Sequence, residues 1–291
     1  MNGEEDIDQV PKSSDTPEDG NENISQEQTI EQLKTQSENM EVHHHPDLHH
    51  RKKHWKEYFL EFLMIFLAVT LGFFAESLRE NIVNSHKEHQ YMTSMVTDLK
   101  RDTAELSQYL AWQQYDMSKM DSALKIPVEK LNDIDMQDIF YHHFVYFYSW
   151  VFLFYQNDNT FTQLKNEGGF NVIRYKAITD SIGELELFYN QQVKLNGNYY
   201  NDDYKKAEEL GAHIMIMPEP PVWSEDTLYK FYPRHVEVLT RNDRPSLEEL
   251  YSWIRNEKGT LRVYMSNEKI YREAAIRLFD QINNKYHLKN N

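Results

Sequence analysis

An uninterrupted apolar run constrains the fold of this chain more than any other feature. Residues 58–75 read YFLEFLMIFLAVTLGFFA, and Glu61 is the only charged side chain among these 18 residues. At 1.5 Å per residue, a helix of this length is about 27 Å long, close to the hydrocarbon thickness of a bilayer. A buried core helix is the alternative, but apolar side chains around the whole circumference favour a membrane span. We therefore predict one transmembrane helix over residues 58–76.

The residues that flank this run predict its orientation. Cationic and aromatic side chains suited to a membrane interface precede or begin it: Arg51, Lys52, Lys53, Trp55, Lys56 and Tyr58. The segment from Glu76 to Glu80 holds two acidic residues and one arginine. By the positive-inside tendency, the N-terminus is then cytoplasmic and the residues after the span are periplasmic. The prediction is a single-pass protein of the cell inner membrane, with the span as an uncleaved signal anchor.

Charge is distributed unevenly along the chain. Of the net charge of −16, residues 1–42 contribute −10, with twelve acidic and two basic residues and no aromatic one. Such a composition buries too little apolar surface to fold, so we predict a disordered acidic tail, with a short partner-induced helix near Ile30–Leu33 as the alternative. An acidic chain also repels the phosphates of nucleic acid, so we predict no nucleic-acid partner. The absence of cysteine excludes disulfides, zinc ribbons and a cysteine nucleophile.

Histidines are concentrated just before the span. Residues 43–57 form a juxtamembrane segment rich in His and Lys, in which the candidate metal ligands are His43, His44, His45, His49 and His50. Neutral imidazole binds zinc, nickel or copper, but neighbouring lysines disfavour another cation. The favoured interpretation is attraction of this segment to anionic lipid, and no metal or other cofactor is predicted.

Residues 77–291 are expected to form a helical, bundle-like extracytoplasmic domain. Apolar residues recur every three or four positions from Met92 to Leu110, with Lys100, Arg101, Asp102 and Glu105 on other faces. This indicates an amphipathic helix that continues from the span to about Ala123, either packed in the domain or paired with a second copy as a short coiled coil.

A second apolar stretch, Ile139–Tyr155, has no Lys, Arg, Asp or Glu. It contains two histidines and four tyrosines that would all need partners in lipid, so we predict a central core helix capped by Asp135; a second span is the alternative.

Further helices follow along the chain. Thr160 with Gln163 and Ser246 with Glu249 form capping-box patterns. A closing helix is indicated by a stripe at Ile270, Ala274, Leu278, Ile282 and Tyr286. The tyrosine-rich helix Phe188–Tyr204 is either core or a contact surface. No strand pattern is present, so the predicted fold class is all-α.

The sequence offers little evidence of catalysis. It contains no phosphate-binding loop, dinucleotide-binding glycine pattern or nucleophile elbow, and we expect no enzyme. The leading hypothesis is an interaction, scaffold or sensor protein of the bacterial envelope that binds the lipid bilayer and a second copy or an envelope protein. Glu61 within the span raises a proton-coupled, stator-like alternative. Ala68 and Gly72 would allow close helix packing. A membrane-tethered hydrolase with an unmarked site is the third hypothesis.

Several of these segments also occur together in one known family. The segments are FLMIFLAVTLGFFAE after Glu61, LREN at 78–81, DLKRD at 98–102, and NTFTQLKNEGGFNVI at 159–173 followed by a tyrosine-rich helix. In this order they resemble a widespread uncharacterised family of bacterial single-pass membrane proteins. The acidic tail, the histidines and Glu76 in place of a more usual Gln depart from that family. The resemblance implies the topology and transfers no catalytic residue.

Overall fold

The computed structural model describes residues 54–217, 235 and 237–288. Its helical elements, in chain order, are α2 (Trp55–Leu124), the 3-10 helix η1 (Val128–Asn132), α3 (Ile134–Tyr148), α4 (Asn159–Asn166), the 3-10 helix η2 (Gly169–Val172), α5 (Lys176–Phe188), the π-helix η3 (Tyr189–Val193), α6 (Lys194–Ile214) and α8 (Arg244–Tyr286). Extended pairing in the described residues consists of one isolated antiparallel bridge, between Met215 and Leu239. The predicted all-α class is confirmed. The acidic tail lies outside the described residues.

Helix α2 is 70 residues long and contains the boundary between two compact units, residues 1–68 and 69–291. The described part of the first unit, residues 54–68, is exposed throughout. In the second unit, α2 is exposed up to residue 87 apart from a partly buried Asn84, and its buried side chains begin at Glu88. From there they recur every three or four residues, which is the spacing of one helix face. These residues are Glu88, Met92, Met95, Leu99, Asp102, Leu106, Gln113, Asp116, Met120 and Ala123.

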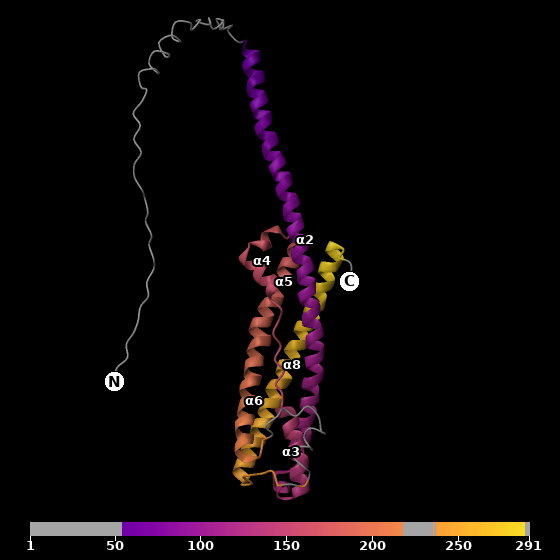
Figure 1. Ribbon diagram of the computed structural model, residues 1–291, viewed down its shortest axis with the longest axis vertical. Coiled ribbons are helices and arrows are strands. Elements are labelled where there is room, and N and C mark those ends of the chain that lie inside the picture. The colour runs from indigo at the N-terminus through magenta and orange to yellow at the C-terminus, as the bar shows by residue number, and fades with distance from the viewer. Residues whose placement is uncertain (1–53, 218–234, 236, 289–291) are drawn as a thin grey trace, which may run out of the picture. The chain divides into compact units, whose positions relative to one another are not determined.

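Within the second unit, α2, α6 and α8 run side by side, with α3 at one end of the bundle and α4 and α5 at the other (Figure 1). The predicted amphipathic helix therefore packs inside its own domain: Met92 and Leu106 are fully buried there. Helices α5, η3 and α6 are consecutive from Lys176 to Ile214.

Helix α8 corrects two predictions about the C-terminal region. It is one helix of 43 residues that begins at Arg244, and its N-cap is Asp243, whose carboxylate accepts a hydrogen bond from the backbone N–H of Ser246. An acidic N-cap satisfies one of the free N–H groups of the first turn, so Ser246 is not needed as the cap. The buried stripe includes Tyr271, whereas Ile270 is 46% exposed. The predicted stripe was therefore wrong by one position there.

The apolar stretch Ile139–Tyr155 is only partly helical. Helix α3 begins two residues earlier, with Asp133 as its N-cap in place of Asp135, and ends at Tyr148. The extended residues that follow bond to long helices: Gln113 Nε2 donates to the carbonyl of Phe152, and the N–H of Phe154 donates to the Tyr264 hydroxyl. These partners allow buried backbone to leave the helix without an unsatisfied polar group. Helix α3 itself is a core helix whose Phe140 and Phe144 are fully buried.

Candidate functional site: an acidic junction on the first helix

The described residues of the predicted membrane segment are exposed on the surface of α2. Trp55, Tyr58 and Gly72 are exposed, and a Cβ added at Gly72 would contact nothing within 4 Å. Lys56, Glu61 and Ala68 are exposed as well. The following sequence-predicted residues lie outside the described part of the chain: His43, His44, His45, His49, His50, Arg51, Lys52 and Lys53. In the described part, one helix, α2, is long and apolar enough to cross a membrane.

Two of the sequence segments described above meet in the second unit. Asp98 of α2 accepts hydrogen bonds from the N–H and the hydroxyl of Thr160, at 3.2 and 2.5 Å. Asp102, one turn later, accepts from the N–H and the side-chain amide of Asn157, at 2.9 and 2.6 Å. We call this contact between Asp98, Asp102 and residues 157–160 the acidic junction. It corrects the capping-box prediction, because the Thr160 hydroxyl bonds to α2 instead of capping α4.

Helix α8 completes the acidic junction. The Tyr271 hydroxyl lies 3.1 Å from the second carboxylate oxygen of Asp102 and 3.2 Å from Gln156 Oε1. Asp102 is 2% exposed, which corrects its expected place on a solvent-facing side of the helix. Burial raises the pKa of Asp102, and the hydrogen bonds from Asn157 and Tyr271 oppose that rise. The carboxylate is thus a structural acceptor that joins three parts of the chain.

A small pocket of about 30 Å³ opens beside the acidic junction. Its polar lining consists of the side chains of Asp98, Asp102, Gln156, Asn157, Asp158, Glu186 and Tyr271. Gln156 also donates a hydrogen bond to Glu186. With four carboxylates in its wall, the pocket favours hydrogen-bond donors and cations and disfavours anions. Among the described residues, however, no group of three His, Asp or Glu side chains is placed to hold a metal ion.

A third carboxylate of α2 fixes the segment after α4. Glu88 is fully buried and accepts from the N–H and the guanidinium of Arg174, both at 2.7 Å, and from the Tyr286 hydroxyl at 2.6 Å. Both the guanidinium and the Tyr286 hydroxyl reach the same carboxylate, so α2, the end of α8 and the residues before α5 are joined. Charge-assisted bonds of this kind are about twice as strong as neutral ones.

A second group of buried acids lies further along the bundle, where α2, α6 and α8 pack. Burial raises the pKa of Asp116 and of Glu268 to about 8, and it raises that of Glu257 well above its usual range. Tyr264 and Gln113 lie beside Glu268 and oppose its rise. Neither carboxylate oxygen of Glu257 has a hydrogen-bond partner in the described structure. These acids are therefore protonated in the folded domain near neutral pH.

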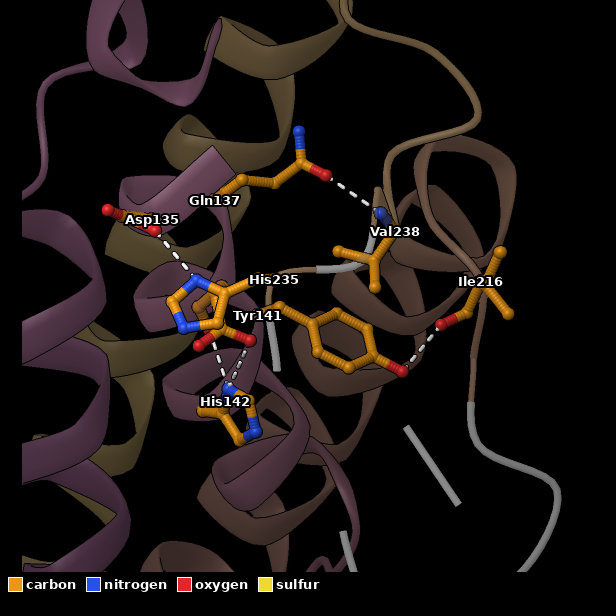
Figure 2. Close-up of polar contacts among 8 residues, drawn as sticks. Asp135, Gln137, Tyr141, His142, Ile216, His235 and Val238 are labelled. Atoms are coloured by element: carbon orange, nitrogen blue, oxygen red, sulfur yellow. Dashed lines mark hydrogen bonds and ion pairs between the residues drawn. The ribbon is translucent and has the colours of Figure 1, made fainter. Parts of the chain in front are cut away.

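Polar side chains of α3 hold the two segments that flank residues 218–234 (Figure 2). Gln137 Oε1 accepts from the N–H groups of Val238 and Leu239, at 2.7 and 3.1 Å, and the Tyr141 hydroxyl donates to the carbonyl of Ile216. His142 is buried, and its Nδ1 lies 2.7 Å from the carbonyl of Asp138. His142 is therefore a core histidine whose Nδ1 bonds within its own helix.

Sequence reasoning missed the buried acids because charged residues were assigned to solvent. The signal was present in the spacing: Glu88, Asp102 and Asp116 continue the buried row of α2, and Glu257 and Glu268 continue that of α8. By contrast, Tyr189 and Tyr200 of the tyrosine-rich helix are core residues, although Tyr199 is 54% exposed. No family model, curated protein or solved structure matches this chain.

Proposed function

We propose that this protein is a membrane-anchored interaction or scaffold protein of the bacterial envelope. Its N-terminus is cytoplasmic in this proposal, residues 58–76 are the signal anchor, and the helical domain is periplasmic. The observation that carries the proposal is helix α2, which contains both an exposed apolar segment and the first core-forming segment of a folded domain. An apolar segment with 0% of its side chains buried needs a surrounding other than water.

Topology reporters test the anchor and its orientation. Alkaline phosphatase and a fluorescent protein are fused after Asn39, after Asn132 and at the C-terminus of the full chain. We expect phosphatase activity at the last two sites and fluorescence at the first, because the cationic flank precedes the span. Substitution of Arg51, Lys52, Lys53 and Lys56 by Glu should reduce phosphatase activity at the C-terminus. A cytoplasmic C-terminus in the unmodified chain would contradict the proposed topology.

An exposed aromatic surface on the domain supports a role in protein contact. Trp112, Tyr109 and Phe152 form a cluster in which the Trp112 and Phe152 ring centroids are 4.7 Å apart. Trp112 is 39% exposed, and Tyr115, one turn along α2, is 47% exposed. Tryptophan and tyrosine are enriched at protein interfaces. This surface replaces the tyrosine-rich helix as the candidate contact surface of the domain.

Site-specific photocrosslinking tests this surface. Incorporation of p-benzoylphenylalanine at Trp112 or Tyr115 of the full chain should give discrete adducts with an envelope protein in intact cells. Tyr199, which is exposed on α6, serves as the matched control and should give adducts at least about fivefold weaker, since each contact worth about 1 kcal/mol changes occupancy about fivefold. Equal labelling at all three sites would argue against a defined contact surface at Trp112.

A further inference from the structure

We propose that residues 71–82 of α2 form a parallel seam with the same residues of a second copy. The seam consists of Leu71, Ala75, Leu78 and Ile82, which recur at intervals of four, three and four residues. This is the heptad spacing that two helices need to pack along their length. The inference rests on the proposed function, because a shared membrane anchor is what gives both copies the same direction.

The described structure leaves this seam uncovered. Leu71, Leu78 and Ile82 are 64%, 48% and 69% exposed. After the apolar run ends at Ala75, residues 76–87 form a stretch of α2 about 18 Å long at 1.5 Å per residue. All of that stretch is exposed except a partly buried Asn84. Leu78 and Ile82 are therefore apolar side chains on a single helix beyond the predicted span, where a partner helix would remove them from water.

Charge around the seam is compatible with a second copy. Glu76 and Glu80 lie on the opposite side of the helix at 100° per residue, so the carboxylates of two copies would not face each other. Arg79, which lies nearer the seam, is paired with Glu76 of its own helix at 2.9 and 2.5 Å. A parallel pair therefore brings together apolar side chains without placing unpaired like charges between the helices.

The bundle leaves space for this partner. At 100° per residue, the direction of the seam differs by about 100° from that of the buried row that begins at Glu88, Met92 and Met95. A second helix along the seam would thus lie beside the bundle of the first copy, not across it. Because both copies are inserted in the same direction, the pair is parallel, and each seam residue faces its own counterpart across a twofold axis.

The natural absence of cysteine makes a direct test available. Single substitutions Leu71→Cys, Leu78→Cys and Ile82→Cys are made in the full chain, with Glu76→Cys and Glu80→Cys as controls at the same height on the opposite side. Each purified protein is reconstituted in liposomes at low protein density and oxidised, and the disulfide-linked dimer is quantified on non-reducing gels. We expect at least fivefold more dimer at the seam positions than at the controls.

Equal cross-linking on both sides of the helix, or no dimer at Leu78 and Ile82, would overturn the seam. Cross-linking of those positions to a different protein in native membranes, with no dimer in liposomes, would also overturn it and identify another occupant. Carbonate extraction of the same membranes separates this test from the proposed function. If the chain stays in the membrane but forms no seam dimers, only the seam proposal is contradicted. If carbonate releases the chain, the proposed membrane anchor is contradicted. Circular dichroism of each variant confirms that the helices are formed.

Discussion

Replacement of Glu268 by glutamine is expected to stabilise the helical domain at neutral and alkaline pH. Glu268 is fully buried on α8, and burial raises its pKa from 4.5 to about 8. Between these two pKa values, the folded chain keeps the proton that the unfolded chain has released. Unfolding then releases a proton, so the free energy of unfolding falls as pH rises, by about 1 kcal/mol per pH unit for this group. Below about pH 4.5 Glu268 is protonated in both states, so it no longer makes the free energy of unfolding depend on pH.

Glutamine removes this pH dependence because it stays neutral in both states. The Glu268→Gln variant should have a free energy of unfolding about 3 kcal/mol higher than that of the unmodified chain at pH 7 to 8, and nearly the same at pH 4. The measurement is urea unfolding of the full chain in a mild detergent, followed by circular dichroism at each pH. Glu273→Gln, on the exposed side of the same helix, is the matched control and should leave the difference between pH 4 and pH 8 unchanged. If Glu268→Gln instead lowers the stability at pH 8, the buried carboxylate is ionised and paired.

Helical periodicity was enough to predict the main elements of the fold. The apolar residues Met92, Leu99 and Leu106 indicated one face of a long helix, and all three are buried in α2. Spacing alone did not distinguish a bundle helix from a coiled coil, because both bury the same residues of a helix face. In this structure the helices that pack beside α2 are α6 and α8 of the same unit (Figure 1).

Helix ends were predicted less well, because side chains far away in the sequence decide them. The capping-box pattern at Thr160 is locally sound, yet Asp98, 62 residues earlier, takes both its hydroxyl and its N–H. In the same way, the apolar stretch after Tyr148 leaves the helix because Gln113 and Tyr264 bond to its backbone. A prediction from neighbouring residues alone cannot include these distant hydrogen-bond partners.

The acidic junction could be predicted in part. The segments that contain Asp98, Asp102 and Thr160 were both singled out, but the sequence did not show that they touch. The reason is physical: a buried aspartate is expected only where it is paired, and its partner Asn157 is 55 residues away. Pairing of the two segments explains why polar residues can occupy core positions of α2.

Asp102→Leu is expected to cause the largest loss of stability at this junction. The change leaves two donors without an acceptor, the N–H of Asn157 and its side-chain amide, while the Tyr271 hydroxyl keeps Gln156 Oε1 as its acceptor. Each buried donor left unsatisfied costs about 1 to 3 kcal/mol, so we expect a total loss of about 3 kcal/mol, allowing for partial access to water. Asp102→Asn keeps one acceptor oxygen and should cost about 1 kcal/mol. Urea unfolding of the full chain measures both values.

Hydrogen exchange distinguishes loss of the junction from general loosening of the bundle. In Asp102→Leu, peptides covering residues 155–166 should exchange at least tenfold faster, whereas peptides from the middle of α6 should change little, because the junction anchors the first segment alone. Asp180→Ala, which removes a surface ion pair with Lys176, is the control and should change stability by less than about 1 kcal/mol. Equal acceleration in both regions would show that Asp102 supports the whole bundle. If Asp102→Leu leaves exchange at residues 155–166 unchanged, the carboxylate does not hold that segment.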